Sequence, residues 1–167
     1  MHLETEEPKK YAYATHYHGV AGAKGDNAIM GGTYEWQADQ PSGCSRGGIS
    51  TNGIFYKDSK TRIGDVTDGT SHTIMIGEQL FGLSSWVVGM SPSPGWACDM
   101  INCHNVYYGI NVAPYNNHDA SFSSTHPGGA QFVRSDGSTQ FVSEDIDIGI
   151  YRAMASRNGG EPLGLDE

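Results

Sequence analysis

The side chains best suited to chemistry in this sequence are its histidines and its acidic residues. Nine residues separate His126 from Asp136, and a histidine close to a carboxylate can orient a ligand or bind a metal ion. We favour a structural role, in which the His126 ring bonds the region of Asp136 or a loop carbonyl and fixes the start of a strand. Pro127 supports this role because it biases the His126 backbone towards extended geometry. Metal or ligand binding by His126 with Asp136 is the alternative.

Cys98 and Cys103 lie five positions apart in a loop-rich stretch and are candidates for a disulfide. Two other interpretations stay open. The cysteines could be free buried thiols, or Cys98, Cys103 and His104 could bind zinc, although a fourth ligand at a recognisable spacing is missing. One cysteine is left over in any pairing, and it could pair with a segment absent from this chain.

Asp145 and Asp147 are weak candidates for a calcium site, because calcium is bound by clustered carboxylate and carbonyl oxygens. Other acidic residues also lie in turns: Asp65, Asp68 and Glu144. The sequence has no Asp-x-Asp-x-Asp-Gly loop, so the capping of turns and helices explains these residues better. We therefore expect no cofactor, with calcium as the alternative.

The sequence motifs of common enzyme classes are absent. It lacks Gly-x-Ser-x-Gly, His-Glu-x-x-His and the phosphate-binding Gly-x-x-x-x-Gly-Lys-Ser/Thr. Glu78 and Glu161 could act as a catalytic carboxylate pair only if the fold brought them together. We expect Glu78 to bond loop amides and Asp68-Gly69 to end a helix, and we predict that the protein is not an enzyme.

The composition limits the classes of partner. The chain has 167 residues, 10 Lys and Arg against 19 Asp and Glu, and a net charge of −9. Phosphate backbones and anionic lipids attract clustered cations, so the charge argues against nucleic-acid binding and electrostatic membrane adhesion. No apolar run approaches the roughly 18 residues of a membrane span. The length fits one domain over residues 11–163, with a disordered or engineered lead-in (1–10) and a short tail (164–167).

Two strand-like segments, 130–135 and 138–143, flank Asp136-Gly137 and predict a β-hairpin. Asp-Gly favours a two-residue type I′ turn, which would place Phe132 directly opposite Phe141. The other face of the hairpin would carry Val133 and Val142. Apolar residues on both faces indicate that each face is covered.

Two helices are predicted beside this hairpin. Residues 147–158 should form one, with Asp147 as its N-cap and an apolar stripe of Ile150, Tyr151 and Met154. Residues 61–68 should form a shorter one, from an N-cap at Thr61 to a C′ glycine at Gly69.

Several short strands complete the predicted fold. Residues 71–79 have strand composition, with Ile74 and Ile76 on one face. Further extended segments are expected at 11–25, 52–56 and 85–89. The predicted fold class is α+β, a mainly antiparallel twisted sheet with long irregular loops and short helices.

Two separated blocks of this sequence resemble the H-X9-DG family of bacterial pilin-like surface proteins. The first runs from His126 through Gly128, Gly129 and Asp136 to Gly137 (HPGGAQFVRSDG). The second, at 63–78 (IGDVTDGTSHTIMIGE), is similar to the family pattern DGTSNT…GE and contains Asp68, Gly69 and Glu78, with His72 where an asparagine is usual. The resemblance covers roughly residues 11–163. This family has been labelled a domain of unknown function and sometimes a solute-binding protein.

The resemblance implies an extracytoplasmic, pseudopilin-like head, at the cell surface or in the periplasm. It implies assembly with other pilin-like subunits or type II secretion components, in filaments of the type IV pilin kind. Family members usually carry a long apolar N-terminal helix, which this chain lacks. We therefore expect either a head cut from a longer protein or a variant that cannot enter a filament by the usual route. Such a head would keep an apolar groove where the helix packs, and would reach the membrane only through that helix.

A binding module for a glycan, a small solute or calcium is the alternative function. Flat aromatic rings in loops can stack on sugars, and several are available: Trp36, Trp86, Trp96, Tyr107, Tyr108 and Tyr115. We expect these rings mainly to fill a core that is short of aliphatic side chains.

Overall fold

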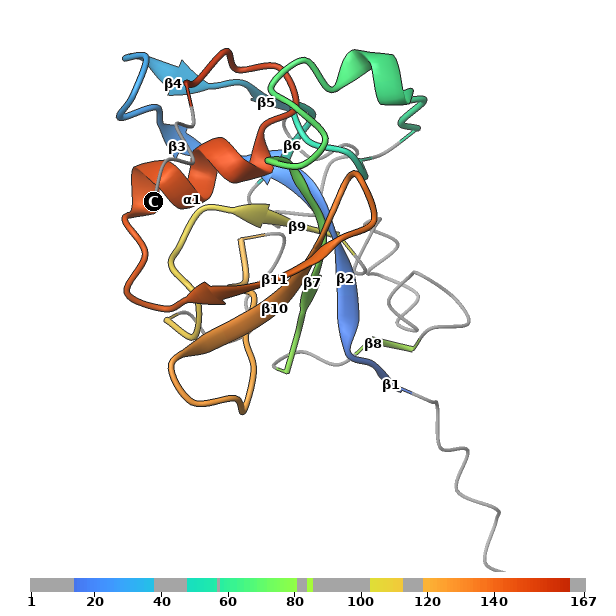
Figure 1. Ribbon diagram of the computed structural model, residues 1–167, viewed down its shortest axis with the longest axis vertical. Helices are drawn as coiled ribbons and strands as arrows, with labels where there is room; N and C mark the ends of the chain where they lie inside the picture. Colours follow the sequence, from blue (N-terminus) through green and yellow to red (C-terminus); the bar gives the residue numbers. More distant parts are fainter. Residues whose placement is uncertain are drawn as a thin grey trace, which may run out of the picture.

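A computed structural model of the chain describes residues 14–37, 48–56, 58–80, 84–85, 103–112 and 119–162. Its centre is a five-stranded sheet in the order β11-β10-β7-β2-β9 (Figure 1). These strands are β2 (Tyr17–Ala23), β7 (Ile74–Glu78), β9 (Cys103–Val106), β10 (Gly129–Arg134) and β11 (Thr139–Ser143). All neighbours are antiparallel except β2 and β9, which are parallel. The predicted α+β class, with a mainly antiparallel sheet, is confirmed.

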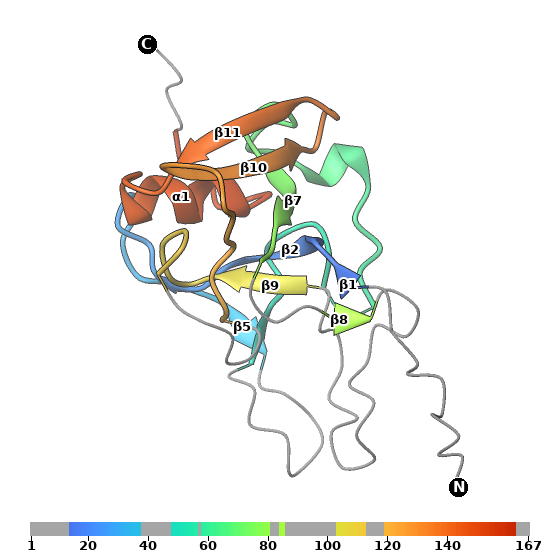
Figure 2. The same cartoon turned by 90° about the horizontal axis from the view of Figure 1, so that it is seen from below.

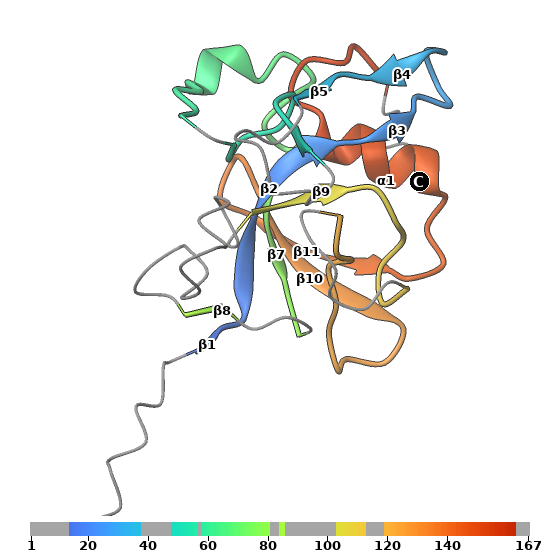
Figure 3. The same cartoon turned by 180° about the vertical axis from the view of Figure 1, so that it is seen from behind.

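Three pairs of two-residue strands surround the central sheet. They are β1 (Ala14–Thr15) with β8 (Ser84–Ser85), β3 (Gly25–Asp26) with β4 (Thr33–Tyr34), and β5 (Trp36–Gln37) with β6 (Ile49–Ser50). The β3–β4 pair lies beside the α-helix α1 (Ile148–Ala155), as seen from behind in Figure 3. No helix within the described ranges is long and apolar enough to cross a bilayer.

The helix α1 (Ile148–Ala155) packs on one face of the sheet, mainly against β2. Asp147 caps it as predicted, because its carboxylate accepts hydrogen bonds from the backbone N–H groups of Gly149 and Ile150. The apolar stripe is only partly correct, since Tyr151 and Met154 are buried whereas Ile150 is 44 % exposed. The core beneath the helix consists of Val20, Ala23, Tyr34, Ile74, Val106, Ile110, Phe122, Ala130, Phe132, Val142, Tyr151, Met154 and Ala155.

The β10–β11 hairpin forms where predicted, but its turn is one residue longer. Gly137 N donates to Arg134 O and Arg134 N donates to Ser138 O, which encloses a three-residue loop. Gly137 has φ +87°, whereas Asp136 lacks the positive φ that a type I′ turn also needs at its first central residue. The loop is therefore a turn followed by a glycine bulge.

The extra turn residue shifts the register and corrects the predicted pairing. Phe132 lies opposite Gln140, and Phe141 lies opposite Gln131. Phe132 and Val142 therefore share the face covered by α1, and both are buried. Phe141 lies on the opposite face and is 44 % exposed. The prediction that both hairpin faces are covered is wrong for this second face.

A bulge in β7 separates Ile74 from Ile76, which were predicted to share a face. Val133 pairs with Ile76 and the next residue, Arg134, pairs with Ile74, so Met75 is an extra residue in β7. Ile74 consequently lies in the core, whereas Ile76 shares the opposite face with Val133.

The region 51–69 also differs from the prediction. Residues 51–55 form bends instead of a strand, and the predicted helix at 61–68 is a single 3₁₀ turn, η1 (Ile63–Asp65). Its N-cap position is Arg62, because the Arg62 N–H bonds the Asp65 carboxylate. The predicted lead-in (1–10) and tail (164–167) lie outside the described residues, as does most of the strand predicted at 85–89.

We expect Gly137→Ala to lower the free energy of unfolding by about 1–2 kcal/mol, because an L-residue in the left-handed conformation costs about this much. A Cβ at Gly137 would meet no atom within 4 Å, so only the backbone conformation is tested. Gly64→Ala is the matched control, since its Cβ also meets nothing and its φ is not positive. Urea denaturation measures the free energy of unfolding of both variants and of the wild type. Equal losses in the two variants would contradict the proposed turn conformation.

Candidate functional site

The two blocks of the predicted motif meet where β7 ends and β10 begins. Glu78 is the last residue of β7, and its Oε1 lies 3.3 Å from His126 Nε2. Its Oε2 accepts a 2.7 Å hydrogen bond from the backbone N–H of Gln131. The pairing of β7 with β10 causes this meeting, because Gly77 lies opposite Phe132 and Glu78 therefore adjoins Gln131.

The predicted contact between His126 and the Asp136 region is wrong. The two residues flank β10, which has six residues, and an extended strand of that length spans about 20 Å. The partner of the His126 ring is the carboxylate of Glu78 instead. The prediction that Glu78 bonds a backbone amide agrees with the structure, although that amide lies in a strand.

A polar cleft of about 190 Å³ opens beside this pair. It is lined by His16, Tyr17, Glu78, Gln79, Leu80, Ser123, Ser124, Thr125 and His126. Gln79 is 1 % exposed, and its Oε1 accepts a 3.1 Å hydrogen bond from Ser123 Oγ, while its Nε2 has no hydrogen-bond partner among the described residues. Ser124 Oγ accepts from the backbone N–H of His126 at 3.1 Å, not from its ring. The cleft offers both donors and acceptors next to an exposed tyrosine.

The remaining motif residues bind backbone groups. Both carboxylate oxygens of Asp68 accept hydrogen bonds, from Gly159 N at 2.7 Å and from Gly160 N at 3.0 Å. Gly69 follows with φ +100° and begins a turn. Its carbonyl accepts hydrogen bonds from the backbone N–H groups of His72 and Thr73. The motif at 68–69 therefore anchors the chain after α1 and does not end a helix.

Asp136 acts within its own turn. Its Oδ1 accepts from Ser138 N at 2.8 Å and from Ser138 Oγ at 2.7 Å, and these bonds hold the pKa of the carboxyl below its usual value. Gly128 has φ +81°, and a side chain at Gly129 would collide with the Val142 carbonyl. Both glycines thus allow the chain to enter β10, as predicted.

The calcium candidates have other partners or are exposed. Asp147 Oδ1 caps α1, and Asp145 is exposed. Within the part of the chain that the structure describes, no group of three or more His, Cys, Asp and Glu residues is arranged to hold a metal ion.

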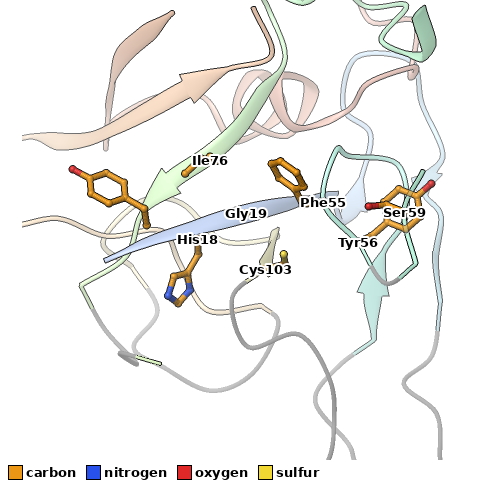
Figure 4. A pocket seen from close by; sticks show the side chains of 8 residues that line it. His18, Gly19, Phe55, Tyr56, Ser59, Ile76 and Cys103 are labelled. Atoms are coloured by element: carbon orange, nitrogen blue, oxygen red, sulfur yellow. The ribbon is translucent and has the colours of Figure 1, made fainter. Parts of the chain in front are cut away.

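A second cavity, of about 310 Å³, lies on the sheet face opposite α1 (Figure 4). Its lining is mainly apolar: Tyr17, His18, Gly19, Phe55, Tyr56, Ser59, Ile76 and Cys103. Gly19 lets Cys103 and Phe55 approach β2 closely, because a Cβ there would lie 2.8 Å from Cys103 Sγ and 2.9 Å from Phe55 Cβ. Cys103 is a buried free thiol, and burial raises its pKa to about 12. Its predicted disulfide partner, Cys98, lies outside the described residues.

Two buried polar pairs were not predicted from the sequence. His18 Nδ1 lies 2.6 Å from His104 Nε2, so a hydrogen bond joins the two rings across the neighbouring strands β2 and β9. Lys24 Nζ lies 2.7 Å from Asp119 Oδ2, and the same carboxylate accepts from Asn105 Nδ2 at 2.6 Å. The partners in each pair are distant in sequence, so no local pattern indicates them.

Three aromatic residues of the predicted sugar platform already contact other side chains of the chain. Lys24 Nζ lies 5.1 Å from the centre of the Trp36 ring and 5.5 Å from that of Tyr107, within the range of cation–π contacts. Tyr108 packs edge-on against Tyr107 and is 45 % exposed. The other three rings, Trp86, Trp96 and Tyr115, lie outside the described residues.

We expect Glu78→Ala to cost about 1–2 kcal/mol of stability, because the Gln131 amide loses its acceptor. His126→Ala should cost less than about 1 kcal/mol, since the His126 side chain is 56 % exposed and exposed ion pairs contribute little. Glu78→Gln keeps an acceptor and is the matched control. Chemical denaturation of the variants and of the double mutant gives the coupling. A larger loss for His126→Ala than for Glu78→Ala would contradict this assignment.

We expect Cys103 to resist alkylation at pH 8, because its pKa of about 12 keeps it as a thiol. Since the ordinary value is 9.0, its contribution to stability is complete below pH 9 and declines as the pH rises towards 12. Iodoacetamide labelling of a Cys44→Ser/Cys98→Ser variant, folded and in urea, measures the difference. Labelling at equal rates in both states would contradict the burial of the thiol.

Comparison with known proteins gives one match. Residues 5–149 match the model of a family described as a protein of unknown function (DUF1559). No curated protein and no solved structure matches the chain. Because the match spans most of the 167 residues, this chain belongs to the DUF1559 family.

Proposed function

We propose that this protein is a non-enzymatic, extracytoplasmic, pseudopilin-like subunit of a surface or secretion assembly. The observation that supports the proposal best is the exposed apolar face of the central sheet. Subunits that act by assembly require such a surface, whereas monomeric proteins rarely expose large contiguous apolar patches.

The apolar face is built from the strand registers. Gly19, Ile76 and Val133 lie in one row across β2, β7 and β10. In the adjacent row Tyr17 and Phe141 stand at the two ends, with the polar residues Glu78 and Gln131 between them. Tyr17 is 57 % exposed and Phe141 is 44 % exposed. Phe55, which borders the same cavity, is 38 % exposed. Ile49 and Tyr56 form a small cluster with Ala21 and Cys103 towards one end of this face.

The sequence resemblance supports the same function. Heads of pilin-like proteins pack on a long apolar helix. The cavity of about 310 Å³ has a mainly apolar lining, against which apolar side chains of such a helix could pack. The motif residues are consistent with a non-enzymatic role, because Asp68, Asp136 and Glu78 bond backbone groups. Their chemistry is used to hold loops and strand ends in place.

The polar cleft supports a second candidate, a binding module for a glycan or small solute. Gln79 Nε2 has no acceptor within the described part of the chain, so a bound ligand could supply one, and the exposed Tyr17 ring borders the same cleft. Sugars combine hydroxyl groups with apolar ring faces and match such a lining. A thermal-shift screen with simple sugars and calcium tests this alternative.

We expect intact cells of the source organism to expose this protein to added protease, while a cytoplasmic marker stays protected. A photo-reactive p-benzoylphenylalanine at Ile76 should crosslink it to subunits of its assembly, because Ile76 lines the apolar cavity. The matched control carries the same group at Asn158, an exposed residue after α1. Mass spectrometry identifies the products. Protection from protease, or equal crosslinking at both positions, would overturn the proposal.

A further inference from the structure

The outer edge of β11 is open for pairing. β11 is the last strand of the sheet, and Figure 2 shows it at the outside of the β10–β11 hairpin. Bonds from Arg134 N to Ser138 O and from Glu144 N to Gly128 O fix which residues of β11 face β10. Because bonding alternates along an antiparallel pair, the N–H groups of Thr139, Phe141 and Ser143 point away from β10.

These outward groups are unused in the described chain. Thr139 and Phe141 direct both N–H and C=O outwards, and only the Ser143 carbonyl has a further partner, Ile146 N at 3.2 Å. The opposite edge of the sheet differs, because the segment that contains β6 lies against it. The Asn105 side chain of β9 accepts a 2.8 Å hydrogen bond from Ser50 N and donates one of 2.9 Å to Gly48 O.

The β11 edge also lacks the features that prevent edge pairing. Natural edge strands are commonly protected by charged residues, proline or bulges. β11 has the sequence TQFVS, which contains no charge and no proline, and its register with β10 is unbroken. At its centre Phe141 presents an aromatic ring that is 44 % exposed.

We propose that β11 pairs antiparallel with β11 of a second copy of this chain, about a twofold axis through Phe141. This arrangement places Phe141 opposite Phe141 and Thr139 opposite Ser143, so every open donor meets an outward acceptor. The two Phe141 rings meet on the apolar face, and such aromatic cross-strand pairs are favourable. The inference rests on the proposed function and specifies the partner of one contact in the assembly.

The charges near β11 should make the association of the two copies depend on salt. The twofold arrangement brings Glu144 and Asp145 of one copy towards the turn at Asp136 of the other, and all three residues are exposed. Repulsion between exposed carboxylates is screened by salt. The association is therefore expected to strengthen between 50 and 500 mM NaCl.

Sedimentation equilibrium of the purified chain tests the pairing. Wild type should dimerise, whereas Phe141→Lys and Phe141→Glu should each raise the dissociation constant at least tenfold, because a like charge then faces itself. A 1:1 mixture of the two variants should restore dimers, since Lys then faces Glu. Gln131→Lys is the matched control, because Gln131 is exposed next to Phe141 on β10, one strand in from the edge; it should change the constant less than threefold.

A further variant tests the backbone bonds. Phe141→Pro removes the ring and, from the backbone, one outward N–H, and proline is tolerated at such edge positions. Phe141→Ala removes the ring alone and is the matched control. Phe141→Pro should melt close to Phe141→Ala and abolish dimers more completely. A monomeric wild type at 500 µM in 500 mM NaCl, or a mixture of variants that stays monomeric, would overturn the inference. The proposed function is judged separately by protease exposure and crosslinking at Ile76, so either can fail alone.

Discussion

The packing of two phenylalanine rings over Gly77 fixes the centre of this fold. A Cβ at Gly77 would lie 2.6 Å from Phe122 Cδ1 and 2.7 Å from Phe132 Cδ1, so only glycine allows the rings to cross β7. Phe132 also packs edge-on against Tyr151 of α1, with ring centres 5.8 Å apart. This contact chain sets the register of β7 against β10 and holds the helix on the sheet. One residue beyond Gly77, the same register brings Glu78 to Gln131 and His126.

The motif residues that suggest chemistry in the sequence are used to position backbone. Asp68 holds the two glycines after α1, Asp136 closes its own turn, and Glu78 holds the first part of β10. A carboxylate that accepts backbone N–H groups offsets the cost of burying or bending the chain there. Two features remain available for partners, the apolar face and the cleft that Tyr17 borders together with Glu78 and His126.

Local signals predicted local structure well, and non-local pairing could not be predicted from them. Asp147 and the apolar residues after it located α1, and Asp136-Gly137 located the hairpin, because capping and turn formation depend on near neighbours. The register was wrong because a glycine bulge and a type I′ turn have the same dipeptide signature and differ by one residue. In β7 the extra residue Met75 likewise moves Ile76 to the face opposite Ile74. The meeting of His18 with His104, 86 positions apart, depends on the whole topology.

The parallel pairing of β2 with β9 has a consequence for how the chain reaches this structure. β2 begins at Tyr17 and is internal to the sheet, yet its neighbour β9 begins only at Cys103. Bringing two strands so distant in sequence together costs chain entropy before their contacts form. Folding should therefore be slow for a domain of this size. During synthesis, β2 waits without its partner until most of the chain has left the ribosome. The early strand is thus exposed to chaperones and to aggregation for longer than the C-terminal hairpin, which can form as soon as it is made.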